Sequence, residues 1–248
     1  RVSVNYSISG EAIDWAVPVV FARNPAQHLC LPRTAADYER TRTAAVRSRR
    51  RAVENRTKIG IWNAHRMIPH LPEICERLTK AQNQYAFETV SFPAPIGIWR
   101  REQEKDQAFV VAETLYDRLK TKPTELGIET LICMINFPMK DARTRYLYYW
   151  RRDPLIVTST FGLLEQLNER EFTVERMMAH LAATVVAGIA PHPRRIGPAD
   201  CPLFYNDKRD IRSIAGRLTF CDACRKQFKD KAGQARLRAA ERLLAAYP

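Results

Sequence analysis

Three cysteines near the carboxyl-terminal end of the chain have spacing typical of a metal site. Cys221 and Cys224 form a Cys-x-x-Cys pair, and Cys201 precedes them beside a proline. One tight turn can present both thiolates of such a pair to an ion, and zinc accepts four sulfur or nitrogen ligands in a tetrahedron. His192, between two prolines, is the fourth candidate. The sequence therefore predicts a structural Zn²⁺ in a closed Cys₃His site.

The Cys-x-x-Cys pair has two other interpretations. A redox dithiol of the thioredoxin type follows a strand near the start of its fold, whereas this pair precedes the last predicted helix. The cysteines could also be incidental buried thiols, as we expect for the three that stand singly among apolar residues, Cys30, Cys75 and Cys133. If zinc is bound, it fastens the final helix to the preceding loop.

The composition describes an ordinary globular chain with a strong positive charge. Its 248 residues are 46% hydrophobic and 27% charged, enough for one large or two small domains. No apolar run is long enough to span a membrane, so we expect no membrane partner. Forty basic residues against 27 acidic ones give a net charge of +13. Such a charge attracts nucleic acid, acidic proteins or anionic lipid, although it is also consistent with a solvated Arg-rich surface.

The chain divides into three parts. Residues 1–33 are apolar and strand-like, residues 34–57 form an Arg-rich linker or exposed helix, and a regular alternation of elements fills residues 58–248. The first residues do not resemble a signal peptide, and no initiating Met is present. We therefore expect a piece of a longer, cytoplasmic polypeptide.

Strands and helices alternate in the third part. Thr173 is the predicted N-cap of a buried helix. Short apolar runs predict strands, and apolar residues three and four apart predict helices. The strands are expected at 58–62, 85–92, 129–135 and 155–159, and the helices at 66–83, 104–121, 173–190 and 222–246. This order favours an α/β fold, with a mixed sheet backed by helices and a zinc-stapled loop and helix at the carboxyl-terminal end.

Residues 128–224 resemble the archaemetzincins, a metzincin family of zinc metallopeptidases. The segments 131–135 and 156–160 match two strands of that family. Residues 178–188 match the helix that carries H-E-x-x-H-x-x-G-x-x-H-C in the family, and the three carboxyl-terminal cysteines match its structural zinc ligands. The resemblance implies a metzincin-like fold with a zinc site.

The catalytic motif of that family is degenerate in this chain. If His180 is the first histidine, Leu181 stands in place of the glutamate that polarises water, and Thr184 in place of the second zinc ligand. We therefore predict no catalytic residue, and a chain that is not an enzyme by itself. The alternative is an active zinc-dependent peptidase that uses rearranged ligands, with His180 joined by His65, by His70 or by a carboxylate that no motif identifies.

The segment 13–23 resembles the closing strand of CHAT and caspase-like protease domains. This second resemblance implies a protease domain upstream of the chain. The metallopeptidase-like domain would then be a recognition or regulatory module of a larger bacterial stress or defence protein. Its partner would be another protein or the upstream part of the same polypeptide. A nucleic-acid-binding domain, with the zinc loop and the basic last helix as contact surface, is the further alternative.

Overall fold

The computed structural model describes residues 56–99, 101–104, 107–169, 172–189, 200–204, 211–216 and 218–247. Three predictions lie outside these residues: the strand-like segment at 1–33, nearly all of the Arg-rich segment at 34–57, and the ligand His192. All described residues belong to one compact unit, residues 48–248.

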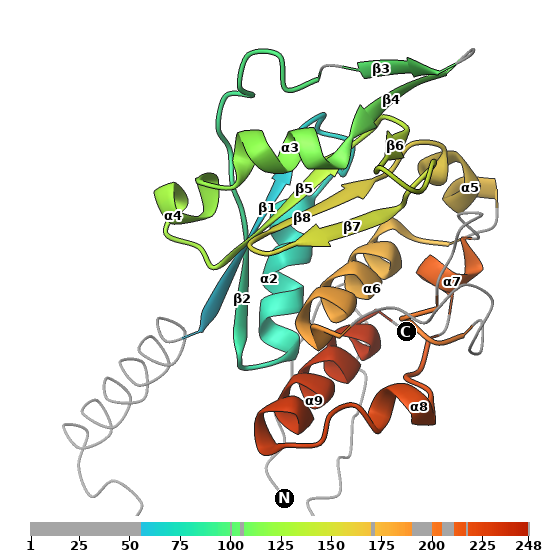
Figure 1. Ribbon diagram of the computed structural model, residues 1–248. Coiled ribbons are helices and arrows are strands. Elements are labelled where there is room, and N and C mark those ends of the chain that lie inside the picture. The colour runs from blue at the N-terminus through green and yellow to red at the C-terminus, as the bar shows by residue number, and fades with distance from the viewer. Residues whose placement is uncertain are drawn as a thin grey trace, which may run out of the picture. The chain divides into compact units, whose positions relative to one another are not determined.

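A five-stranded mixed sheet forms the centre of this unit (Figure 1). The strand order is β2-β1-β5-β8-β7, and every neighbouring pair is parallel except β7 and β8. Its strands are β1 (Thr57–Asn63), β2 (Tyr85–Thr89), β5 (Thr130–Ile135), β7 (Tyr149–Arg152) and β8 (Leu155–Ser159). The three central strands are apolar on both sides, because helices cover both faces of a parallel sheet.

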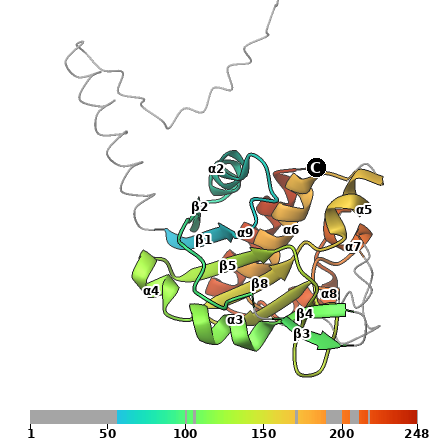
Figure 2. The ribbon, with the colours of Figure 1, turned by 90° about the horizontal axis from the view of Figure 1, so that it is seen from above.

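Helices pack on both faces of this sheet (Figure 2). Alternate residues of β5 point to opposite sides: Ile132 lies in the core beneath α2 and α6, whereas Leu131 lies in the core beneath α3. The helices are α2 (Leu71–Ala81), α3 (Ala112–Leu119), α4 (Lys122–Leu126), α5 (Leu163–Glu169), α6 (Val174–Ala187), α7 (Arg212–Ala215), α8 (Asp222–Arg225) and α9 (Lys231–Ala245). The predicted α/β fold with a helix-backed mixed sheet is therefore confirmed.

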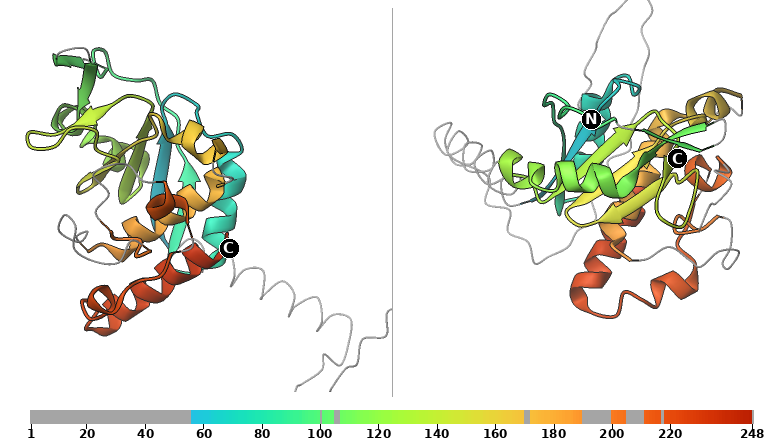
Figure 3. Two further views of the ribbon diagram at one scale, coloured as in Figure 1. Left: turned by 90° about the vertical axis from the view of Figure 1, so that its right-hand side faces the viewer. Right: turned by 45° about the horizontal axis from the view of Figure 1, so that its top comes forward.

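Helix α6 lies between the sheet and α9 (Figure 3). Every residue from Met177 to Ala187 is buried, as its nearly continuous apolar sequence requires. Thr173 is its N-cap, as predicted: the hydroxyl oxygen accepts a hydrogen bond from the backbone N–H of Arg176 at 3.2 Å. Gly188 ends the helix in the left-handed conformation that favours glycine.

Replacing Thr173 with Ala is expected to lower the free energy of unfolding by about 1 kcal/mol, because one amide at the start of α6 loses its acceptor. Denaturant unfolding measures this cost. Thr124→Ala is the matched control, since the exposed Thr124 of α4 has no side-chain hydrogen bond to the described residues. An equal effect of the two substitutions would contradict the capping role.

Two predicted helices differ from the structure. Residues 104–121 were expected to form one helix, but 107–111 form strand β4, and α3 begins only at Ala112. β4 (Gln107–Val111) pairs with β3 (Arg101–Glu104) and β6 (Met139–Lys140) in a small second sheet. The final helix is also divided, because Asp230 caps α9 by accepting a hydrogen bond from the backbone N–H of Gly233. Among the described helices, none is both long and apolar enough to cross a membrane.

Candidate metal centre

The side chains of Cys201, Cys221 and Cys224 converge on one point. Their three sulfur atoms all lie within 4.8 Å of one another. Cys201 and Cys224 are buried, whereas Cys221 is half-buried. Two separate segments supply these sulfurs: the loop that follows α6 carries Cys201, and the start of α8 carries the pair.

The sulfur spacing fits a zinc ion and not a disulfide. The Sγ atoms of Cys201 and Cys224 are 3.7 Å apart. A bonded pair of sulfurs would be about 2 Å apart. Four ligands in a tetrahedron around zinc, with each sulfur about 2.3 Å from the ion, place neighbouring sulfurs about 3.8 Å from one another. The donor set and its geometry therefore suit Zn²⁺.

Backbone amides surround the thiols and influence their ionisation. Burial is the largest influence and raises the pKa of Cys201 and of Cys224. Burial also tends to raise the pKa of Cys221. Hydrogen bonds, among them those from the backbone N–H groups of Cys224 and Ala223, lower it by more, so the net shift of this pKa is downward. Because the thiolate is the form that binds metal, the lowered pKa makes Cys221 the thiol of the three that most readily loses its proton to bind the ion.

Backbone contacts hold the two cysteine segments together. The backbone N–H of Thr219 donates to the carbonyl of Asp200 at 2.9 Å, which places the residues before Cys221 beside Cys201. The guanidinium of Arg225 donates to the carbonyl of Phe220 at 2.9 Å and closes the turn around the pair. Within the described residues no fourth His, Cys, Asp or Glu joins the group.

His180 fastens the Cys201 loop to α6. Its Nε2 lies 2.7 Å from the carbonyl oxygen of Pro202, and since a carbonyl only accepts, Nε2 must carry the hydrogen. The hydroxyl of Thr184 lies 3.3 Å from the same nitrogen. Burial lowers the pKa of His180 to about 4, so the ring is neutral near pH ~7. The residue is thus a buried structural contact next to the cysteine cluster.

The described residues do not assemble the alternative peptidase ligands. His180, His65 and His70 join no group of three or more side chains close enough to hold an ion. The ring of His65 packs between Trp99 and Phe137, with centroid distances of 4.7 and 4.8 Å, and its Nδ1 accepts a hydrogen bond from a backbone amide. His70 is exposed at the N-cap of α2.

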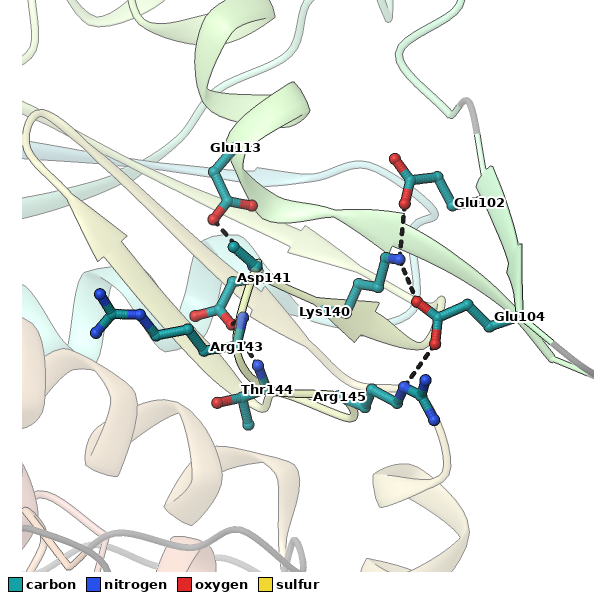
Figure 4. Close-up of polar contacts among 9 residues, drawn as sticks. Glu102, Glu104, Glu113, Lys140, Asp141, Arg143, Thr144 and Arg145 are labelled. Carbon is teal, nitrogen blue, oxygen red and sulfur yellow. Dashed lines mark hydrogen bonds and ion pairs between the residues drawn. The ribbon is translucent and has the colours of Figure 1, made fainter.

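A polar cavity of about 880 Å³ lies between the small sheet, the start of α3 and the 141–145 loop (Figure 4). Lys140 pairs with Glu102 at 2.7 Å and also with Glu104, while Arg145 pairs with the second oxygen of Glu104 at 2.5 Å. These cations lower the pKa of Glu104, with Lys140 the larger cause. The charges largely satisfy one another, and the network ties β3 to β6. No local sequence pattern indicates this network, because β3 is more than 30 residues from Lys140 and Arg145 along the chain.

Comparisons with known proteins yield two similar solved structures. One is an archaemetzincin from Methanopyrus kandleri, with 15% identity, a TM-score of 0.49, and coverage of 74% of this chain and 97% of that one. The other is a zinc-dependent peptidase from Methanocorpusculum labreanum, with 10% identity, a TM-score of 0.41, and coverage of 68% and 98%. No protein-family model and no curated protein sequence matches the chain. At such identities and TM-scores neither likeness bears on activity.

The class of protein is defined by the chain's own features: a mixed α/β domain with a helix-backed sheet and, near its carboxyl-terminal end, a cluster of three cysteines outside the sheet.

Proposed function

We propose that the chain is a zinc-stapled, non-catalytic metallopeptidase-like domain that acts as a recognition or regulatory module of a larger protein. The observation that carries the proposal is the convergence of three cysteine sulfurs within 4.8 Å, from two segments separated in sequence. Incidental buried thiols have no reason to gather in this way. A redox pair needs only two sulfurs, and the third here is as close as a zinc ligand would be.

Cys201, Cys221 and Cys224 would hold the ion, with His192 the candidate for the fourth position. A zinc ion with four protein ligands has no site left for water or substrate, so its role is to stabilise the fold. It would join the loop after α6 to the start of α8. That link matters because α8 has only four residues, too few to be stable as a helix by itself.

The absence of catalysis is inferred from the helix that resembles the peptidase motif. His180 donates its Nε2 hydrogen to Pro202 and is buried, so this nitrogen is not available to a metal. Leu181 and Thr184 occupy the positions of the general base and the second ligand, and neither can perform those roles. A domain that has the metallopeptidase-like fold but lacks the general base and the second zinc ligand can still bind a partner. We therefore assign it a binding role.

Metal analysis of the purified chain tests the proposal. We expect about one zinc ion per chain, a loss of zinc in Cys221→Ser and in His192→Ala, and unchanged zinc in His180→Ala. Cys75→Ser is the matched control, because Cys75 is a buried thiol of α2 outside the cluster and its replacement should leave the zinc in place.

Two results would overturn the proposal. Absence of zinc from the purified chain would contradict the proposed structural role of the three cysteines as zinc ligands. A second zinc ion that disappears in His180→Ala would restore a catalytic site and favour the peptidase alternative.

A further inference from the structure

Helix α9 carries three cations in one line along its outer surface. Lys231, Arg238 and Arg242 are separated by seven and then four residues, and at 100° per residue they lie within about 40° of one another. All three are exposed. The buried residues of α9, among them Leu237 and Ala240, lie on the opposite side, against α6. The line is about 16 Å long, at 1.5 Å per residue.

Within the described part of the chain, no carboxylate neutralises this line. The nearest acidic residue on the helix surface is Glu241, at the margin of the line, and it pairs with Arg225 at 2.5 Å. Asp230 caps the helix with its side chain. Two further exposed lysines, Lys226 and Lys229, lie on the segment that joins α8 to α9. None of these five cations has an ion-pair partner among the residues that the structure describes.

We propose that this surface, the basic line, formed by Lys231, Arg238 and Arg242, binds the phosphate backbone of a nucleic acid duplex. The inference rests on the proposed recognition role, because it names the partner of that role. Cations held on a straight helix at intervals of about 6 and 10 Å can each reach a different phosphate. Arginine adds paired hydrogen bonds to phosphate oxygens.

The residues around the cations indicate which class of partner fits this surface: a protein, a single strand or a duplex. Gln234, Ala235 and Ala245 lie beside these cations on the outer side of α9, and they are small or polar. Protein interfaces are enriched in aromatic side chains and depleted in lysine, which does not describe this surface. Proteins that bind single strands stack the bases on aromatic rings, and the basic line has none. A duplex backbone requires only cations at the right spacing.

Fluorescence anisotropy with a labelled duplex of about 25 base pairs, measured on the full chain over a series of salt concentrations, tests the inference. The variant Lys231→Gln/Arg238→Gln/Arg242→Gln removes three charges from the basic line. The matched control, Lys58→Gln/Arg118→Gln/Arg143→Gln, removes three exposed charges that lie on β1, α3 and the 141–145 loop and likewise have no ion-pair partner among the described residues. Both variants have the same net charge.

At about 0.1 M salt we expect the α9 variant to bind the duplex at least tenfold more weakly, and the slope of log affinity against log salt to decrease by about 0.9 for each lost contact. The control variant should stay within about threefold of the original chain. Equal losses in both variants would overturn the inference, because binding would then follow net charge alone. Tighter binding of a single strand of the same sequence, or no binding by the original chain, would also overturn it.

Zinc content separates this inference from the proposed function. The α9 variant keeps all three cysteines, so its zinc content and thermal unfolding should match those of the original chain. If the chain binds zinc but no duplex, only the nucleic-acid inference is wrong. If it binds the duplex through the basic line but holds no zinc, only the proposed zinc site is wrong.

Discussion

Replacing Cys224 with Ala is expected to lower the free energy of unfolding by far more than the same replacement of Cys75. Both thiols are buried, with exposed fractions of 1% and 2%, so the lost packing is matched. That loss should cost about 1 kcal/mol in either case. Cys224→Ala also removes a zinc ligand, and we expect an additional cost of about 5 kcal/mol or more. A loss of that size is comparable with the whole stability of many domains.

Denaturant unfolding, followed together with zinc content, measures the difference between the two variants. A zinc chelator supplies the second control: once the ion is removed from every sample, Cys224→Ala should cost no more than Cys75→Ala. If the two substitutions are equally costly while zinc is present, the ion does not stabilise the fold.

Acidification is expected to destabilise the chain through His180. Burial lowers the pKa of this imidazole to about 4 in the folded state, whereas an unfolded histidine titrates near 6.5. The group contributes its full stability above pH ~6.5, and this stability is lost as the pH falls toward ~4, because the unfolded chain then takes up a proton that the folded chain resists. Between pH ~7 and pH ~5 the loss should amount to about 2 kcal/mol.

His180→Gln isolates this contribution. A glutamine amide can still donate to the carbonyl of Pro202, but it has no proton to gain in this range. The variant should therefore lose about 2 kcal/mol less than the original chain between the two pH values, as measured by denaturant unfolding at each. Protonation of the cysteines and release of zinc affect both chains, so they cancel in the comparison. Parallel pH profiles would show that His180 does not titrate in this way.

The sequence by itself determined the elements whose signals are local. The short apolar runs of β1, β5 and β8 favour strands covered on both sides, and strands are found where they were expected. The start of α6 was equally clear, since a threonine before a long apolar segment is a strong capping signal. The three carboxyl-terminal cysteines were selected on residue type and spacing alone.

Local patterns failed where two periodicities agree over a few residues. Phe109 and Val110 fit a helical face and a buried strand equally well. This segment is a strand because it pairs with β3 and β6, and β6 lies in a distant part of the chain. The break before α9 was hidden in the same way, because its basic and small residues continue the helical pattern of the preceding turn.

Only the tertiary structure decided what these residues can do together. Spacing in sequence could not show that the sulfur of Cys201 lies 3.7 Å from that of Cys224, since a loop and α7 come between them. It also could not show that His180 is engaged with Pro202, or that Lys140 is held by two glutamates of another strand. The physical reason is the same in each case. Helix and strand periodicity act between near neighbours, whereas a site is made by side chains that folding brings together from distant segments.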